Sequence, residues 1–420
     1  RHVGTAKPVS VTGLSLTGDD AANYKLGTTT ASAGKADITV RPLSTWIGAA
    51  GGSWGSPSNW DALPDGNNVL AVSIPSGTGG IIFDASVGSV NLQTLGSARP
   101  LVISGGDVTV GSSLSVPELS MSAGSLSGTG GLNITNGLNQ TGGSIVMAGS
   151  ILANQSSGNM VVGTMSAPSI FLTANSGAIS QSGPLTTAEL QTVSTAGTSL
   201  TNTGNKISSF TAGNTGSGNI TLNNGVPVDI KSAVNTAGDF TIENVGGVTF
   251  NDKAVVVING KLTAVANSPL IVGAGGITAG GDISLVATNL TSAGNITLNG
   301  PVTSDGAVQL NAASDLVQNS SVLGAKGVSA TVGGKISFGP LATTGKDPIV
   351  YSSGGTTVTA PVPATAKSAS AGDVIVTFLD LFDKAVENQK EEIFITRSDG
   401  TTRRRNTSDA ITSEGEICRP

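Results

Sequence analysis

Charged and aromatic residues are scarce in this chain of 420 residues, at 11% and 3% of the sequence. A compact globular domain carries roughly 25% charged residues, so the composition argues against an ordinary globule. A disordered chain is also disfavoured, because 38% of the residues are hydrophobic and they are spread evenly in short runs. The net charge of −6 argues against nucleic acid as a partner, since nucleic-acid binding depends on clustered Lys and Arg. The one basic cluster, Arg403 to Arg405, is interpreted as a solvated charge run.

Reactive side chains are nearly absent. Cys418 is the only cysteine and His2 is the only histidine. No internal disulfide can form, so packing must supply the stability. A single histidine disfavours His-dependent acid–base catalysis and a histidine metal site, and a cysteine without a histidine partner disfavours a thiol nucleophile. We therefore expect no catalytic site, no cofactor and no metal site.

Long apolar runs are missing as well. No run approaches the roughly 18 to 20 residues of a membrane-spanning helix, so no membrane span is expected. The chain opens at Arg1 in the middle of a strand-like pattern, without a signal peptide. We therefore expect a fragment whose targeting signals lie upstream.

Glycine is abundant, with 59 residues, and it punctuates short aliphatic strands from about residue 76 to 360. Strands near Ile220, Phe240, Leu262 and Ile283 follow one another at steps of 20 to 22 residues. A period of that size is one coil of a β-helix. The sequence thus predicts an all-β fold with a right-handed parallel β-helix, or solenoid, over residues 76–360, with about 13 or 14 coils. The four side chains are predicted to stack in its core.

Residues 1–41 have the pattern of strands joined by Gly and Asp turns. The string KPVSVTGLSLTGDDAANYKL, at residues 7–26, is followed by ADITV, at residues 36–40. Together they resemble the closing half of a YDG repeat module, which occurs in tandem in large secreted bacterial adhesins. The Tyr-Asp-Gly opening of that module is absent, so residues 1–41 are interpreted as the C-terminal part of a YDG-like β module.

All three tryptophans, Trp46, Trp54 and Trp60, fall within residues 42–75. This segment resembles the entry segment ahead of the β-helix in secreted surface proteins. The indoles could stack on sugar rings, or they could cover the open apolar end of the first coil, since an uncapped solenoid exposes its core and its edge strand. Terminal repeats need such covers, so we favour aromatic capping over glycan contact.

Three segments are predicted after the β-helix: a linker over 361–371, a short amphipathic helix over 372–396 and a disordered polar tail over 397–420. The helix rests on the spacing of Val374, Phe378 and Phe382.

A parallel β-helix is also the fold of many pectin lyases and polysaccharide hydrolases, which gather acidic residues on adjacent coils. Here the acidic residues stand mostly one per coil at strand entries, where an Asp usually caps a turn: Asp229, Asp239, Asp252, Asp282, Asp305 and Asp315. A glycosidase needs two carboxylates within ~5 to 10 Å, and no segment supplies an obvious pair. The strings Gly105-Gly106-Asp107 and Gly280-Gly281-Asp282 resemble calcium-binding repeats but stand alone, which favours turns.

The truncated YDG module, the Trp-rich entry and the Ser/Gly/Asn-rich β-helix together resemble the C-terminal region of filamentous-haemagglutinin-like adhesins of two-partner secretion. The resemblance implies export by an outer-membrane partner transporter, through an N-terminal domain absent from this sequence. It also implies secretion or display at the bacterial cell surface, and attachment to a host-cell receptor, glycan or matrix. Some such adhesins end with a cysteine pair, whereas Cys418 has no partner. Two alternatives stay open: a secreted β-helix polysaccharide-degrading enzyme, and an inert spacer for an upstream binding domain.

Overall fold

The computed structural model describes residues 3–267, 269–290 and 294–362, together with five short strand segments after residue 373. The chain forms two compact units. Unit 1 comprises Arg1–Val228 and Asn235–Gly238, and unit 2 comprises Asp229–Val234 and Asp239–Pro420. The fold is all-β, with about 14 solenoid turns in total, a small preceding β-sheet and almost no helix. The predicted fold class is therefore confirmed.

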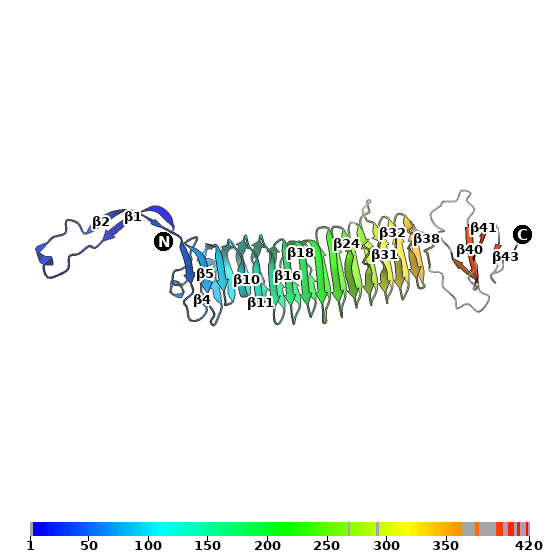
Figure 1. Ribbon diagram of the computed structural model, residues 1–420, viewed down its shortest axis with the longest axis horizontal. Helices are drawn as coiled ribbons and strands as arrows, with labels where there is room; N and C mark the ends of the chain where they lie inside the picture. The colour runs from blue at the N-terminus through cyan, green and yellow to red at the C-terminus, as the bar shows by residue number, and fades with distance from the viewer. Residues whose placement is uncertain are drawn as a thin grey trace. The chain divides into compact units, whose positions relative to one another are not determined.

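The small preceding sheet is an antiparallel pair of strands, β1 (Gly4–Thr12) and β2 (Thr30–Ile38), with Val9 opposite Ala33 (Figure 1). A 3-10 turn, η1 (Ala21–Asn23), lies between them. The apolar side chains along this ribbon are exposed by more than a third: Val9, Val11, Leu14, Leu16 and Ile38. The alternating pattern therefore forms the predicted strand in β1, but in this unit it does not pack on an apolar core.

The solenoid of unit 1 begins at Arg41. The Trp-rich segment at residues 42–75 therefore supplies the first solenoid turn and does not form an entry segment ahead of it. There, β3 (Arg41–Thr45) pairs in parallel with β5 (Val69–Ile74), and β4 (Gly52–Ser53) pairs with β6 (Ile81–Phe83). The 3-10 turns of this region are η2 (Pro57–Asn59) and η3 (Ala85–Val87). The later strands of the unit are β7 (Ser89–Leu92), β8 (Thr94–Ser97), β9 (Leu101–Val110), β10 (Leu114–Gly128), β11 (Leu132–Gln140), β12 (Ser144–Met147), β13 (Ile151–Gln155), β14 (Met160–Val162), β15 (Thr164–Ser166), β16 (Ser169–Ala174), β17 (Ile179–Gln181), β18 (Leu185–Ser194), β19 (Thr198–Leu200), β20 (Lys206–Asn214) and β21 (Ile220–Asn224).

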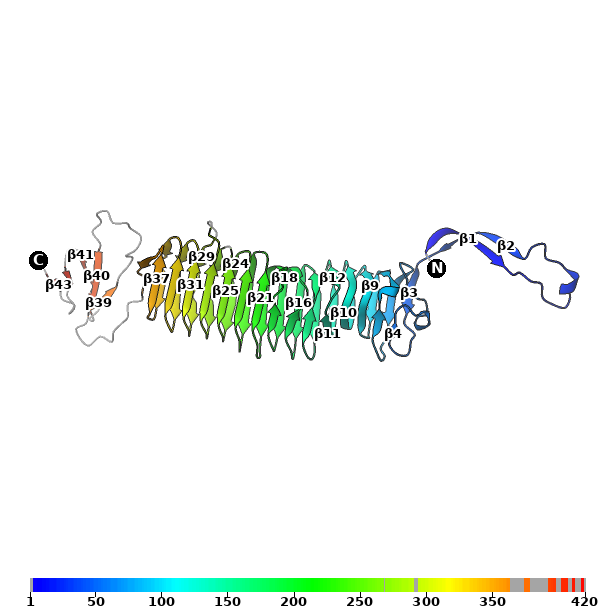
Figure 2. The same ribbon diagram turned by 180° about the vertical axis from the view of Figure 1, so that it is seen from behind.

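Each turn contributes strands to three parallel ladders, as the chain between β13 and β18 illustrates. Strand β13 pairs with β16, β14 with β17, and β15 with β18. Figures 1 and 2 show these short strands lying side by side. Ile151, Ile170, Leu190 and Phe210 are register partners in successive turns, and none is exposed. Like side chains therefore stack directly above one another, which buries apolar area with few aromatic residues.

Strand β22 (Val228–Asn235) is divided between the units. The solenoid strands of unit 2 are β23 (Phe240–Asn244), β24 (Val248–Ile258), β25 (Leu262–Ala266), β26 (Leu270–Val272), β27 (Ile277–Ala279), β28 (Ile283–Ala287), β29 (Ile296–Leu298), β30 (Val302–Ser304), β31 (Val308–Ala312), β32 (Leu316–Gln318), β33 (Ser321–Gly324), β34 (Val328–Val332), β35 (Ile336–Phe338), β36 (Thr343–Gly345), β37 (Ile349–Ser353) and β38 (Thr356–Val358). Each of these strands pairs in parallel with a strand of a neighbouring turn, as β34 does with β37, except β38, which pairs antiparallel with β37.

The core positions predicted from the sequence period are confirmed where the structure gives their partners. Phe240 pairs with Leu262, and Leu262 pairs with Ile283. Ile220 pairs with Thr198 in unit 1. All four predicted side chains are completely buried. The next step, from Ile283 to Val308, is longer because extra residues lie between β28 and β29.

Buried amide side chains occupy corners of the turns, where they bond backbone groups that the parallel ladders leave open. In unit 1, Asn214 is fully buried: its Oδ1 accepts from the Gly197 amide at 3.0 Å, and its Nδ2 donates to Asn235 Oδ1 at 3.0 Å. The same Nδ2 also lies 3.0 Å from the carbonyl oxygens of Ser217 and Gly218. These asparagines therefore link successive turns from inside.

Strands occupy part of the segment that was predicted to be a helix over 372–396. β39 (Val374–Thr377) pairs antiparallel with β40 (Glu392–Arg397), so the helix prediction is wrong at these residues. Both segments carry consecutive β-branched residues, which prefer strands. β41 (Thr402–Asn406) pairs with β40, and β42 (Ala410–Ile411) pairs with β43 (Ile417–Cys418), within the predicted disordered tail. The linker from residue 363 onward and the rest of the predicted helix and tail lie outside the described residues.

Candidate functional site

The three tryptophans form one buried cluster in the first solenoid turn. Trp46 is 2% exposed, Trp54 0% and Trp60 3%. Trp60 contacts both partners, with ring centroids 5.0 Å from Trp46 and 4.7 Å from Trp54. Each indole N–H donates to a backbone carbonyl oxygen, on Gly48, Pro64 and Trp54 respectively. These exposures leave no ring face open to a sugar.

The cluster continues into the solenoid core through Phe83, whose ring centroid lies 5.3 Å from that of Trp54. Phe83 belongs to β6 and is itself fully buried. The indoles thus pack on the apolar interior at the first turn, in the position that a cap must occupy to keep water from the core.

Arg99 supports the same region and was missed by sequence reasoning. Its side chain is buried, at 4% exposure. The guanidinium donates to the carbonyl oxygens of Gly48 and Ala50 in one loop, at 3.4 and 3.0 Å. It also donates to those of Pro75, Ser76 and Thr78 in a second loop, at 3.0, 3.3 and 3.4 Å. A planar group with five N–H donors can bond several carbonyls at once. Arg99 therefore links the loop at residues 48–50 to the loop at residues 75–78 through hydrogen bonds.

The acidic residues at strand entries mostly bond the next turn. In unit 2, each of four aspartates accepts an amide N–H about one coil further along the chain: Asp239 from Lys261 at 2.8 Å, Asp252 from Ala274 at 3.0 Å, Asp282 from Ala307 at 2.9 Å and Asp315 from Lys335 at 2.7 Å. The Ala307 amide holds the pKa of the Asp282 carboxyl below its usual value, with a smaller contribution from Lys261. These carboxylates therefore act as turn caps, because they accept hydrogen bonds from backbone amides.

Asp229 behaves differently from these caps. Its Oδ2 lies 2.6 Å from Lys231 Nζ and accepts from Asn251 Nδ2 at 3.1 Å. Its Oδ1 is buried and has no hydrogen-bond partner among the described residues. One carboxylate beside one lysine supplies a single charged pair, whereas glycoside hydrolysis requires two positioned carboxyl groups.

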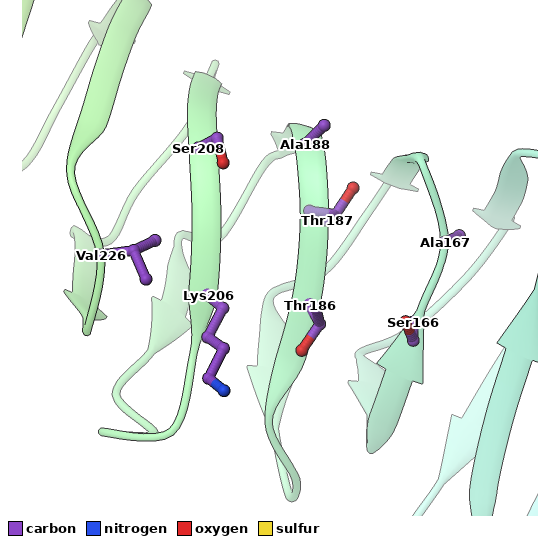
Figure 3. A pocket seen from close by; sticks show the side chains of 8 residues that line it. All are labelled: Ser166, Ala167, Thr186, Thr187, Ala188, Lys206, Ser208 and Val226. Carbon is purple, nitrogen blue, oxygen red and sulfur yellow. The ribbon is translucent and has the colours of Figure 1, made fainter.

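A surface hollow of unit 1 has a volume of about 350 Å³ and is drawn in Figure 3. Its lining comes from neighbouring turns: Ser166, Ala167, Thr186, Thr187, Ala188, Lys206, Ser208 and Val226. In the figure Lys206 extends beside Thr186, its register partner. The lining offers hydroxyls and one ammonium group but no carboxylate or imidazole. The lining therefore lacks a carboxylate or imidazole general base, and Lys206 is its one titratable residue.

Tyr351 is a buried titratable residue of unit 2. It is 1% exposed, and its hydroxyl donates to Gln318 Oε1 at 2.9 Å. Gln318 in turn donates to the carbonyl oxygens of Ser320 and Thr343. Burial raises the pKa of Tyr351 to about 12. The neutral phenol is therefore the form that the folded protein favours.

We expect alkaline pH to destabilise unit 2 through this phenol. Tyr351 ionises near pH 10 in the unfolded chain and near pH 12 in the folded chain. The neutral phenol therefore contributes its full share of the folding stability below about pH 10. That contribution, on the order of 2 to 3 kcal/mol, is lost as the pH rises from 10 to 12. With Tyr24 replaced by Phe, Tyr351 is the only tyrosine left to ionise, and absorbance near 295 nm reports it.

The control is the double variant Tyr24→Phe, Tyr351→Phe, unfolded in urea at the same pH values. Its stability should fall less between pH 10 and 12 than that of Tyr24→Phe alone. Equal losses in the two variants would show that the Tyr351 phenol does not govern the alkaline transition.

The structure places the remaining residues singled out in the sequence only in part. His2 lies outside the described residues. Cys418 stands in β43 opposite Ala410, and Arg403 to Arg405 stand in β41. Within the described ranges, no group of three or more His, Cys, Asp or Glu residues is arranged to hold a metal ion. The described part of the chain also contains no helix that is long and apolar enough to cross a membrane.

Comparison with known proteins identifies one family. A family model for the YDG domain matches residues 1–32, within the segment interpreted from the sequence as a YDG-like module. No curated protein and no solved structure was found to match the chain. The chain thus combines a YDG segment with a parallel β-solenoid.

Proposed function

We propose that this chain is a non-catalytic stalk segment of a bacterial surface adhesin exported by two-partner secretion. The supporting observation is the combination of a YDG match at residues 1–32 with a parallel solenoid. YDG modules and β-helices occur together in large secreted adhesins, so the combination favours display at the cell surface or secretion. A partner transporter in the outer membrane would then move the chain, through a domain beyond this sequence.

The placement of the polar residues supports a structural role. The acidic side chains at strand entries bond backbone amides of the following turns, and the buried amides bond backbone carbonyls. Such groups stabilise a stack of turns and leave few charged side chains for chemistry. A stalk needs regularity along its length, and this use of polar residues provides it.

We expect the full chain to release no reducing ends or unsaturated products from a panel of plant and host polysaccharides. The expectation follows because four aspartates at strand entries accept backbone amides of the next turn, whereas glycosidic cleavage requires a positioned acid with a base or nucleophile. Chromatography and a reducing-end assay would measure turnover. Activity that disappears in Asp229→Asn, and persists in Asp239→Asn, would favour the enzyme alternative instead.

Adherence separates an adhesin from an inert spacer. The purified chain of 420 residues, coated on beads, should attach to cultured epithelial cells or to matrix proteins above the level of albumin-coated beads. Attachment no better than albumin would favour the spacer.

A further inference from the structure

An aromatic side chain faces outward on one ladder of unit 1. Ile170 and Leu172 are buried, and alternate residues of a strand point to opposite faces, so Phe171 between them points away from the core. It is half-buried, whereas Phe83 and Phe210 of the same unit are fully buried. The outward face of a solenoid is expected to be polar, so this aromatic residue needs an explanation beyond core packing.

Phe171 has an apolar neighbour in the preceding turn. Leu152 is its register partner on β13 and is 47% exposed. Asn133 on β11 is the register partner of Leu152 on the other side. Three successive turns therefore place an amide, an aliphatic side chain and an aromatic ring in one outward row.

A hollow of about 230 Å³ lies over this row. It is lined by Asn133, Ile134, Thr135, Leu152, Ala153, Asn154, Phe171 and Thr173. None of these side chains carries a charge. Binding pockets for drug-sized molecules measure about 300 to 1,000 Å³, so this hollow suits a single small ring.

The polar groups of the lining are available to a ligand. Asn154 Oδ1 accepts from Asn175 Nδ2 at 2.9 Å, which leaves the Asn154 amide N–H groups as donors. Within the described residues, the side chains of Asn133, Thr135 and Thr173 make no hydrogen bond to the protein. Amide and hydroxyl groups thus border an apolar floor.

Other kinds of ligand fit this surface less well. A peptide strand would need an open sheet edge, but β13 is paired on both sides, with β11 and β16. A charged ligand would need complementary charge, and the lining has none. An amphipathic helix would need an apolar groove several turns long, whereas Leu152 and Phe171 are surrounded by polar side chains.

We propose that this hollow binds an uncharged pyranose ring of a glycan. The C–H face of the sugar would stack on the Phe171 ring and Leu152, and its hydroxyls would bond the side chains of Asn133, Asn154 and Thr173. The inference rests on the proposed surface function, for which it supplies the class of ligand. It assigns glycan recognition to the flank of the solenoid and not to the tryptophans of the first turn.

The test uses the full chain and defined probes. Saturation-transfer NMR with methyl β-D-galactopyranoside, methyl β-D-glucopyranoside and methyl α-D-mannopyranoside would detect weak binding of single rings. An array of neutral, sialylated and sulfated oligosaccharides would rank longer ligands. We expect binding to at least one neutral pyranoside, and no preference for the sialylated or sulfated forms.

Substitutions then locate the site. Phe171→Ala should weaken binding at least about tenfold, because it removes the stacking surface. Phe171→Trp should keep the affinity within about threefold, and Asn133→Ala, at an exposed position, should weaken binding without disturbing the fold. Val146→Ala is the control, since Val146 is an apolar residue that is 49% exposed and lies outside the hollow.

Several results would overturn the proposal. Binding that Phe171→Ala and Asn133→Ala leave unchanged would place the glycan site elsewhere, and a preference for acidic glycans would exclude the neutral class. Adherence to cells without binding of any array glycan would reject this site but leave the adhesin function standing. If the unmodified chain neither adheres to cells nor binds a glycan, both the glycan site and the adhesin function are rejected.

Discussion

Replacement of Arg99 by Ala is expected to unfold the first turns of unit 1 before the remaining turns of that unit. The Arg99 side chain is 4% exposed, and its guanidinium donates to five backbone carbonyl oxygens. Its removal leaves four of them without a donor from the protein, because Trp46 Nε1 still donates to Gly48. A hydrogen bond to a charged group contributes about 1.5 to 3 kcal/mol, but Ala50 and residues 75–78 are exposed, so water can hydrate their carbonyls when the guanidinium is removed. We therefore expect a net loss of about 2 to 4 kcal/mol. Because a solenoid turn contacts only its neighbours, the loss should remain local.

Two spectroscopic signals distinguish local from general unfolding. All three tryptophans lie in the first turn, so their fluorescence reports this region, while far-UV circular dichroism reports every strand. In urea, Arg99→Ala should shift the fluorescence midpoint to lower concentration and move the dichroism midpoint much less. Gly77→Ala should act in the same direction, because a Cβ there would lie 2.0 Å from Arg99 Nη2.

Arg41→Ala is the control on the same turn. Arg41 makes one ion pair, with Asp61 at 2.8 Å, and its side chain is 47% exposed. Exposed pairs contribute about 0 to 1 kcal/mol, so its fluorescence midpoint should change little. Equal shifts in Arg99→Ala and Arg41→Ala would show that the buried guanidinium has no special role.

The solenoid was predictable because parallel stacking repeats the same contacts in each turn. Phe240, Leu262 and Ile283 must occupy equivalent positions, so the spacing of aliphatic residues in the sequence reveals the coil length. The start of the solenoid was not predictable from this period. Strands β3 and β4 are followed by long loops, so the first turn at Arg41 shows no regular step.

Hydrophobic spacing alone did not predict the C-terminal strands correctly. Val374, Ile375 and Val376 are consecutive apolar residues, which fit both a helical stripe and a buried strand. Their β-branched side chains were the better guide, since β39 is a strand. Periodicity alone did not separate the two structures.

The polar interior was only partly visible in the sequence. Asp239 and Asp282 stand before strands, a position that indicates turn caps. Arg99 is the only charged residue between Asp84 and Asp107, and an isolated charge in an uncharged stretch was an available signal of burial. Asn214 and Asn235 are 21 residues apart, one coil length, which was a second signal. The isolated arginine and the asparagine spacing do not identify the hydrogen-bond partners of these side chains, because the loops that contain the partners have no repeated sequence.

Replacement of Asn214 by Leu is expected to destabilise unit 1 by about 3 kcal/mol or more, although Leu has a similar size and is apolar. The buried Asn214 side chain accepts from the Gly197 amide and donates to the carbonyl oxygens of Ser217 and Gly218. Leu would leave the buried Gly197 amide without a partner, at about 1 to 3 kcal/mol. It would also remove one hydrogen bond each to Ser217, Gly218 and Asn235, at about 0.5 to 1.5 kcal/mol per bond, although Asn235 Nδ2 still donates to Gly218. Urea unfolding followed by circular dichroism would measure the loss.

Asn214→Asp and hydrogen exchange show which half of the amide carries the effect. Asp keeps an acceptor for the Gly197 amide but loses the donors to Ser217, Gly218 and Asn235, so it should also destabilise the unit. In exchange measured by mass spectrometry, the peptide containing Gly197 should lose protection in Asn214→Leu more than in Asn214→Asp. Thr211→Ala, on the outward side of the same strand, should stay within about 0.5 kcal/mol of the unmodified chain. If Asn214→Leu is as stable as Thr211→Ala, the buried amide is not what links these turns, and stacking of aliphatic side chains is sufficient.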